Sequence, residues 1–289
     1  MTTNPTPTSA LHLASIAPNR YVDSPVARFA YRKFGRPGTK PLVFLQRFRG
    51  TMDDWDPDLL DALAAERTIL LFDSAGIGRS TGQTPPTIQG IAEAAASFIE
   101  ALGLGSVDIL GWSLGGTVAQ QLALDRPDLV DKLVIAGSGP GYVADAPAVP
   151  DKVWQVAGKA VNDDEDFLYL FFNETPASRA AGVAHLARLK HRTDAFEAPV
   201  KPASIGAQVA AIQASGHPAG SLLPRLGQLK LPVLVANGIN DVMIPAFKSY
   251  VMAQALPQAK LVLYPDAGHG FLFQYGQAFA REVLVFLEG

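Results

Sequence analysis

Ser113 stands in a sequence pattern that can make a serine a nucleophile. The stretch GWSLGG at 111–116 matches G-x-S-x-G, directly after the strand-like run VDIL and directly before a segment with helical spacing. A sharp turn from strand to helix pushes the serine side chain beyond the sheet edge, and the flanking glycines leave room for it. The turn also aims the N–H of Leu114 at the space in front of the serine oxygen, where a helix N-terminus favours negative charge. We therefore expect Ser113 to be a nucleophile and Leu114 to supply an oxyanion-binding N–H.

Two later loops carry the partners that such a serine needs. A serine hydroxyl is a weak nucleophile at neutral pH, so it requires a base and an acid that orients the base. Asp241 follows the strand-like run in LPVLVANG, and His269 follows the next one, LVLY. The order serine, acid, histidine, each just past the carboxyl end of a strand, predicts a triad of Ser113, Asp241 and His269. Asp266 is the competing acid. It lies only three residues before His269 in the same short loop, where it is poorly placed to orient the imidazole, so we favour Asp241.

The other ionisable side chains form no pattern typical of a metal or cofactor site. The chain has no cysteine, which excludes thiolate nucleophiles, disulfides and cysteine-ligated clusters. The acidic run at 163–166 precedes an apolar segment and is typical of the first turn of a helix. We expect no metal and no cofactor. The remaining histidines are expected to be surface or hydrogen-bonded polar groups: His12, His185, His191 and His217.

Composition narrows the class of protein further. The 289 residues are 48% hydrophobic and 18% charged, with a formal net charge of -3, which excludes a disordered chain and disfavours nucleic-acid binding. Residues 1–20 have neither a positive segment nor a continuous apolar one, so we expect no signal peptide but an N-terminal arm without fixed structure. No run reaches the 18 apolar residues of a membrane span, and we expect a cytoplasmic protein.

Short β-branched runs alternate with helical segments through most of the chain, which predicts an α/β fold with a mostly parallel sheet. Between the strands, apolar residues from 88 to 102 recur at the spacing of one helix face. A second helix should follow Gly115 and end near Arg126, because Pro127 disfavours helical backbone before it. The expected strands are Ala27–Lys33, Leu42–Gln46, Thr68–Phe72, Val107–Leu110, Leu133–Ala136, Val233–Ala236 and Leu261–Tyr264.

The alternation stops between about Tyr142 and Pro224. Alanine-rich helical segments replace the strand-like runs there, and prolines divide them into roughly four helices. The segment is too apolar for a solvated linker, so we expect a helical cap over the carboxyl edge of the sheet. The predicted organisation is a core from 1–141, the cap from 142–224 and the rest of the core from 225–289. Aromatic side chains of the cap are expected mainly in its own core: Trp154, Phe167, Tyr169, Phe171 and Phe172.

With these residues in place, the chain resembles the α/β-hydrolase fold family along nearly all its length except the cap. Residues 73–80, DSAGIGRS, are similar to the family's D-x-x-G-x-G-x-S loop. Residues 50–55, GTMDDW, are similar to the G-S/T-x-x-x-W after its first oxyanion strand. By this resemblance Gln46-Arg47 replaces the usual His-Gly, and Phe48 holds the position of the second oxyanion donor. A backbone donor does not depend on its side chain, so the resemblance implies an oxyanion hole formed by the N–H groups of Phe48 and Leu114.

Arg47 and Arg49 add positive charge near the expected pocket mouth. We expect Arg47 to contact the substrate, together with Trp112 beside the nucleophile. The alternative, equally supported, is that the arginines form ion pairs with nearby carboxylates. The candidates are Asp53, Asp54 and Asp56.

The resemblance implies a serine esterase or lactonase that cleaves a small-molecule ester or lactone through an acyl-enzyme. A serine in place of aspartate disfavours the dehalogenase and epoxide-hydrolase chemistry of this fold. At finer detail, the run QRFRGT at 46–51 and the helical cap are similar to the serine-dependent macrolide esterases, including one carried on resistance integrons. That implies opening of the lactone ring of macrolide antibiotics. Three alternatives stay open: a cofactor-free perhydrolase or haloperoxidase, a carbon–carbon bond hydrolase, and a hydrolase-like ligand receptor. The sequence does not decide the oligomeric state.

Overall fold

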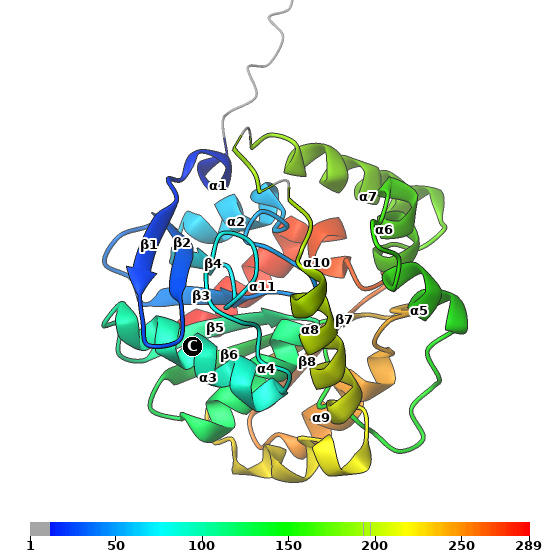
Figure 1. The fold of residues 1–289 in the computed structure, drawn as a ribbon. Coiled ribbons are helices and arrows are strands. Elements are labelled where there is room, and N and C mark those ends of the chain that lie inside the picture. Colours follow the sequence, from blue (N-terminus) through cyan, green and yellow to red (C-terminus); the bar gives the residue numbers. More distant parts are fainter. Residues whose placement is uncertain (1–11, 193, 197) are drawn as a thin grey trace, which may run out of the picture.

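An eight-stranded sheet runs through the molecule (Figure 1). The computed structural model describes residues 12–289 except 193 and 197. The strands are β1 (Arg20–Asp23), β2 (Arg28–Gly35), β3 (Pro41–Leu45), β4 (Thr68–Phe72), β5 (Val107–Trp112), β6 (Val130–Ala136), β7 (Val233–Gly238) and β8 (Ala259–Tyr264). Their order in the sheet is β1-β2-β4-β3-β5-β6-β7-β8; β1 and β2 are antiparallel to their neighbours and all the others pair in parallel. Each of the seven predicted strands has its counterpart, and β1 is an eighth that the sequence pattern did not indicate.

Helices cover both faces of this sheet. Apolar side chains of α3, α4 and α9 form one core with the sheet, and those of α2, α10 and α11 form the core on the other face. In Figure 1, α2, α10 and α11 lie above the strands, and α3, α4 and α9 lie below them. Outside the inserted region the helices are α1 (Leu13–Ile16), α2 (Pro57–Ala64), α3 (Ile88–Ala101), α4 (Leu114–Asp125), α9 (Ala246–Ala255), α10 (Phe271–Gln274) and α11 (Gly276–Glu288).

The predicted helix from 88 is α3, and its sequence explains its bounds. The Thr87 side chain accepts a hydrogen bond from the N–H of Gly90, which caps the helix start. Ile91, Ala95 and Phe98 lie on one face and are buried against the sheet. The next predicted helix, α4, ends at Asp125, just before Arg126 and the proline that follows.

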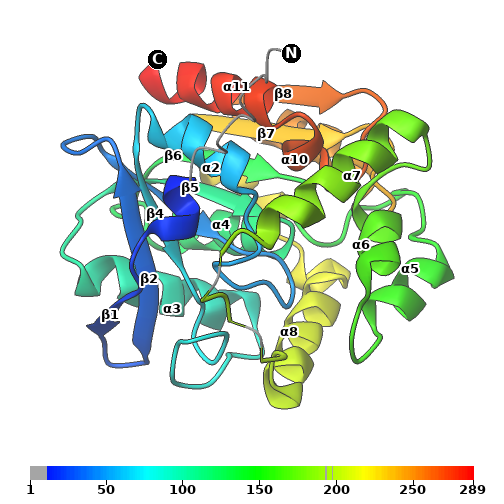
Figure 2. The same cartoon turned by 90° about the horizontal axis from the view of Figure 1, so that it is seen from above.

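A helical region is inserted between β6 and β7. It holds α5 (Asp151–Ala157), α6 (Asp164–Phe171), α7 (Pro176–Leu189) and α8 (Pro202–Ser215), followed by the 3-10 turns η1 (Pro218–Gly220) and η2 (Leu223–Gln228). We call α5–α8 the cap. In Figure 2, α5, α6 and α7 gather beside one end of the sheet, and α8 lies apart from them. The acidic run begins α6 as predicted, because Asp163 is the N-cap and its side chain accepts from the N–H of Asp166 at 2.9 Å.

The N-terminal arm differs from its prediction where the structure describes it. Residues 1–11 of the expected arm lie outside the described residues. From residue 12 the chain is anchored: His12 Nδ1 lies 2.9 Å from Asp61 Oδ2 on α2, and α1 and β1 follow. The expectation of an arm without fixed structure is therefore wrong for residues 12–20. In the part of the chain that the structure describes, no helix has the length and apolar character to cross a bilayer.

The loop at 73–80 is tied together around a buried carboxyl group. Asp73 accepts hydrogen bonds from the N–H of Met52 at 2.7 Å and of Arg79 at 2.8 Å. Gly78 has a φ of 52°, and a Cβ there would lie 2.3 Å from Asp73 Oδ2, so the loop requires glycine. Burial raises the pKa of Asp73 to about 6, although these two backbone hydrogen bonds act in the opposite direction.

Candidate active site

Ser113 occupies a strained turn between β5 and α4. Its φ of 57° and ψ of -123° make it one of four non-glycine residues with positive φ among those described. Such a conformation costs about 1–3 kcal/mol and persists where the surroundings impose it. The neighbours impose it here: a Cβ on Gly115 would lie 2.0 Å from the carbonyl oxygen of Leu45, and a Cβ on Gly111 would lie 2.3 Å from that of Gly115. The turn expected around Ser113 is thus required by close backbone packing.

His269 and Asp241 form a buried pair beyond the ends of β8 and β7. The Nδ1 atom of His269 lies 2.7 Å from Oδ2 of Asp241, and both side chains are fully buried. The other oxygen of Asp241 accepts hydrogen bonds of 2.8 Å from the N–H groups of Met243 and Ile244. With one oxygen held by the backbone, the carboxylate presents the other to the imidazole in a fixed direction.

The second ring nitrogen of His269 is available for chemistry. Nε2 is buried and has no hydrogen-bond partner among the described residues. Ser113 and His269 line one cavity. Asp266, the competing acid, instead accepts from the side chains of Asn173 at 3.1 Å and Thr175 at 2.7 Å. Of the two carboxylates weighed from the sequence, the structure therefore brings Asp241 to the imidazole.

Two backbone N–H groups flank Ser113. Leu114 is the first residue of α4, so its N–H has no partner inside the helix. Phe48 lies in a four-residue turn after β3, closed by a 3.1 Å hydrogen bond from the N–H of Gly50 to the carbonyl of Arg47. The N–H of Phe48 makes no hydrogen bond to another described residue. Because β3 and β5 pair directly, with Leu45 opposite Gly111, the two turns lie side by side at the carboxyl edge of the sheet.

The cavity above Ser113 measures about 620 Å³. It lies between the core and the cap, and its walls combine apolar side chains with charged ones, among them Arg47, Asp54, Lys190 and Arg192. Phe167 and Phe171 of α6 line it, so these two aromatics of the cap serve as cavity wall, whereas Trp154 is 58% exposed. A cavity of this size is large enough for a bulky small molecule.

Arg47 combines the two roles that its sequence position allowed. Its Nη2 lies 2.8 Å from Oδ1 of Asp54, an ion pair, and its Nη1 donates to the carbonyl of Phe48 at 2.8 Å. The guanidinium also lies over the rings of Phe171, at 5.4 Å, and Trp112, at 5.8 Å. Because Arg47 lines the cavity as well, it remains a candidate for substrate contact.

Trp112 does not lie on the cavity wall. Its side chain is fully buried, and its indole Nε1–H donates a 3.1 Å hydrogen bond to the carbonyl of His269. The ring packs edge-on against Phe273, with centroids 4.8 Å apart. The expected contact of Trp112 with substrate is therefore wrong, because the indole lies behind the site and supports the backbone of His269.

Among the described residues Arg49 pairs with no carboxylate, and it binds the cap instead. Its guanidinium donates to the carbonyls of Lys159 at 2.7 Å and Ala160 at 2.8 Å, just after α5. Its backbone N–H donates to Oε1 of Gln208 on α8 at 3.0 Å. Sequence reasoning missed this contact, because no local pattern relates residue 49 to residues 110 or more positions later.

Asp56 holds α7 against α2. It lies 2.7 Å from Nδ1 of the buried His185 and accepts from both Nε and Nη2 of Arg188, at 2.9 and 2.6 Å. Burial alone would raise the pKa of Asp56, but the hydrogen bonds from His185 and Arg188 outweigh burial and lower it. His185 is thus the hydrogen-bonded polar group that we expected, and Asp56 is not a partner of Arg47 or Arg49.

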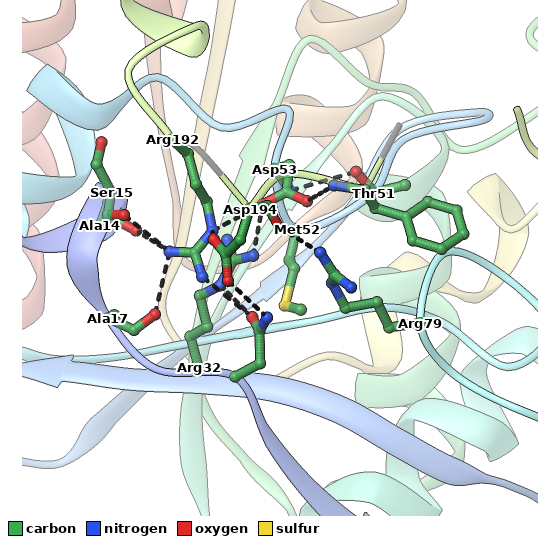
Figure 3. A network of polar contacts seen from close by, with 12 residues as sticks. Ala14, Ser15, Ala17, Arg32, Thr51, Met52, Asp53, Arg79, Arg192 and Asp194 are labelled. Carbon is green, nitrogen blue, oxygen red and sulfur yellow. Dashed lines mark hydrogen bonds and ion pairs between the residues drawn. The ribbon is translucent and has the colours of Figure 1, made fainter. Parts of the chain in front are cut away.

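Asp53 is the centre of a second polar network between core and cap (Figure 3). Its Oδ1 lies 2.5 Å from Nη2 of Arg32, and its Oδ2 accepts from the N–H of Phe196 at 2.8 Å. Arg192 lies beside it, with Nε 2.7 Å from Oδ1 of Asp194. Asp53 is therefore committed to Arg32 and the segment after α7, and not to Arg47 or Arg49. Figure 3 also shows Arg192 reaching the backbone carbonyls of Ala14, Ser15 and Ala17.

The described part of the chain contains no group of three or more histidine, aspartate or glutamate side chains arranged to hold a metal ion. The chemical groups gathered at the cavity are thus a hydroxyl, an imidazole paired with a carboxylate, and backbone N–H groups. Such a set can carry out nucleophilic attack with proton transfer.

Comparison with known proteins identifies the fold family. The family model for the alpha/beta hydrolase fold matches residues 40–274. An alpha/beta hydrolase fold protein from Chitinophaga pinensis has a solved structure that superposes with a TM-score of 0.88 at 36% identity, covering 96% of this chain and 99% of that one.

Two relatives with assigned activities are similar along most of their length. A poly(3-hydroxyalkanoate) depolymerase from Ectopseudomonas oleovorans is 27% identical over 269 residues, covering 92% of this chain and 90% of the relative. A pimeloyl-(acyl-carrier protein) methyl ester esterase from Nitrosomonas europaea is 29% identical over 241 residues, covering 82% and 92%. Since the family model spans well over half of the sequence, the chain belongs to the α/β-hydrolase fold family.

Proposed function

We propose that the protein is a serine hydrolase that cleaves a carboxylic ester or lactone through an acyl-enzyme. The observation that carries this proposal is the buried Asp241–His269 pair beside a cavity that both His269 and Ser113 line, with Nε2 of His269 unpaired among the described residues. Both named relatives act on esters by their names, an esterase and a depolymerase of a hydroxyalkanoate polymer, which supports the same reaction class here.

In the first step Ser113 attacks the substrate carbonyl carbon. As the Oγ–C bond forms, Nε2 of His269 takes the hydroxyl proton, and Asp241 stabilises the imidazolium through Nδ1–H. The carbonyl oxygen becomes an oxyanion, which the N–H groups of Phe48 and Leu114 bind. Loss of one such donor typically costs about 2.7–4 kcal/mol in the barrier, so the position of these two N–H groups matters as much as a side chain.

In the second step the imidazolium returns its proton to the leaving alkoxide, and the alcohol departs from the acyl-enzyme. His269 then takes a proton from water, whose oxygen attacks the acyl carbon, and Ser113 regains its proton as the acid is released. For a lactone the alcohol stays attached to the acyl chain, and the product is one hydroxy acid.

For the substrate we propose a bulky lactone of the macrolide type. The resemblance of residues 46–51 and of the cap to the macrolide esterases supports it, and so does the size of the cavity, about 620 Å³. This choice is finer than the reaction class and needs its own test. The test is to incubate the protein with macrolides and with simple esters and to look by mass spectrometry for products that have gained one water. It distinguishes an esterase that opens macrolides from one that cleaves only simple esters. Turnover of simple esters with every macrolide unchanged would contradict the macrolide proposal and leave the esterase proposal intact.

The reaction class is tested at Ser113. We expect Ser113→Ala to abolish both the hydrolysis of p-nitrophenyl esters and covalent labelling by a fluorophosphonate probe. Ser106→Ala is the matched control, because Ser106 is an exposed serine in the loop before β5. Labelling that survives in Ser113→Ala would overturn the assignment of the nucleophile. Labelling of Ser113 without hydrolysis of any ester would favour the receptor, perhydrolase or carbon–carbon hydrolase alternatives.

A further inference from the structure

The turn that carries Phe48 has a backbone conformation that its sequence does not favour. Arg49 is the third residue of the turn closed by Gly50 and Arg47, and its φ is 59°. A positive φ at this position is the mark of a type II turn, in which glycine or asparagine is preferred. An arginine there costs about 1–2 kcal/mol relative to ordinary backbone, so contacts elsewhere must hold the turn.

Those contacts reach the Phe48–Arg49 peptide from both sides. Its carbonyl accepts a 2.8 Å hydrogen bond from Nη1 of Arg47, whose guanidinium is fixed by Asp54. Its N–H donates a 3.0 Å hydrogen bond to Oε1 of Gln208, a buried side chain on α8. In a type I turn this central peptide is rotated by about half a turn, so that N–H and C=O exchange places. The two hydrogen bonds therefore exclude the type I alternative.

The cap supplies the part of this restraint that the core lacks. Gln208 belongs to α8, and the carbonyls that bind the guanidinium of Arg49 belong to Lys159 and Ala160, after α5. Two separate parts of the cap thus bind the residue next to Phe48. A flipped turn would reverse the peptide dipole beside the Phe48 N–H and change the field at the oxyanion.

We propose that Gln208 and Arg49 are positioning residues through which a seated cap fixes the Phe48–Arg49 peptide, and with it the field beside the Phe48 N–H at the oxyanion site. The inference rests on the proposed serine hydrolase function. If it holds, the rate of attack by Ser113 depends on contacts between cap and core, and the cap does more than shape the cavity.

The first test removes the acceptor on α8. We expect Gln208→Leu to lower the rate constant of fluorophosphonate labelling and the kcat for p-nitrophenyl acetate by about 10- to 100-fold, below the full loss of an oxyanion donor, with KM changed less than about threefold. Gln208→Glu keeps an acceptor oxygen and should recover most of the rate. Ser204→Ala is the matched control, because Ser204 lies one turn earlier on α8 and donates a 2.8 Å hydrogen bond to the carbonyl of Gly76, away from the turn. Equal rates in Gln208→Leu and Ser204→Ala would overturn the proposal.

The second test leaves the buried face of α8 unchanged. Arg49→Gly and Arg49→Ala both remove the guanidinium, but glycine adopts a positive φ freely and alanine does not. We expect Arg49→Gly to be labelled about fivefold or more faster than Arg49→Ala at a temperature where both are folded, because only glycine retains the turn. Equal rates for the pair would contradict the inference even if Gln208→Leu failed to fold.

Failure of the inference and failure of the proposed function are distinguishable. If the unmodified protein is labelled at Ser113 and the Gln208 and Arg49 variants keep its rate, the serine hydrolase stands and the coupling to the cap falls. If the unmodified protein is not labelled, both fall.

Discussion

The indole N–H of Trp112 and the backbone carbonyl of His269 are joined by a buried hydrogen bond of 3.1 Å. The residue before the proposed nucleophile thereby holds the backbone of the proposed base, 157 positions later in the chain. Trp112→Phe keeps an aromatic ring but leaves this carbonyl without its donor. We expect the free energy of unfolding to fall by about 1–3 kcal/mol, measured by urea denaturation. Trp154→Phe, at an exposed site on α5, is the control, and an equal effect of the two would argue against the bond.

Asp241→Asn should lower kcat for an ester substrate by about 10⁴-fold, because the amide favours the wrong imidazole tautomer. Asp266→Asn should change kcat by less than about threefold. Asp266 has a φ of 45°, which asparagine tolerates, and its partners are Asn173 and Thr175. Steady-state kinetics of both variants against p-nitrophenyl acetate measures the difference. The reverse result would assign the acid to Asp266.

Asp53→Ala should lower the free energy of unfolding by about 3–5 kcal/mol, because it leaves the buried guanidinium of Arg32 without its carboxylate. It also frees the N–H of Phe196, a residue of the cavity wall, so KM for a bulky ester should rise more than KM for an acetate. Chemical denaturation and kinetics with both esters test these outcomes. Asp23→Ala is the control: Asp23 pairs with Arg28 at 3.8 Å on an exposed edge, where we expect a change below about 0.5 kcal/mol. If Asp53→Ala and Asp23→Ala lost the same free energy of unfolding, Asp53 would not be stabilising the buried Arg32.

The free energy of unfolding should fall as the pH rises from about 4 to about 6. Burial raises the pKa of Asp73 to about 6, above its ordinary value of 3.8, so the folded state binds a proton in this range that the unfolded state has lost. The contribution of Asp73 is complete below about 4 and lost as the pH passes 6, and at about 1.4 kcal/mol per pKa unit it amounts to about 3 kcal/mol. Burial also raises the pKa of Asp108 to about 6, which acts in the same direction.

Urea denaturation at several pH values measures this dependence. Asp73→Asn should reduce the fall in the free energy of unfolding between pH 4 and 6. Asp108→Asn should reduce this fall further. Asp56 does not interfere, because its pKa is lowered and its contribution is lost only as the pH falls below about 4. If the free energy of unfolding of the double variant Asp73→Asn, Asp108→Asn fell as steeply with pH as that of the unmodified protein, the prediction would be contradicted.

Local sequence patterns carry the elements that hold the proposed site. The strand before Ser113, the glycines around it and the helix after it are all encoded within residues 107–125, so β5 and α4 were predictable. The loops of Asp241 and His269 follow buried strands in the same way. β1 was not predictable, because it is a four-residue edge strand whose side chains are mostly exposed, so it has no burial pattern.

Local sequence patterns do not predict contacts between segments that are distant in the chain. Arg47 and Arg49 have similar sequence surroundings, yet one pairs with Asp54 and the other binds carbonyls of the cap. The difference depends on how the cap packs on the core. The same holds for Trp112, whose burial follows from the packing of His269 and Phe273 around it.

The first four strands of the chain lie together on one side of the sheet, and the last four lie together on the other. β1 to β4 fill one half and β5 to β8 the other, and the halves meet where β3 pairs with β5. Phe48 follows β3 and Leu114 follows β5, so each half of the sheet carries one of the two proposed oxyanion donors. A chain cut at the exposed residues 81–83, between β4 and α3, would yield two fragments, neither with a complete site. Recovery of hydrolysis on mixing them would report the docking of the two half-sheets, which makes this protein a natural candidate for a split-enzyme reporter.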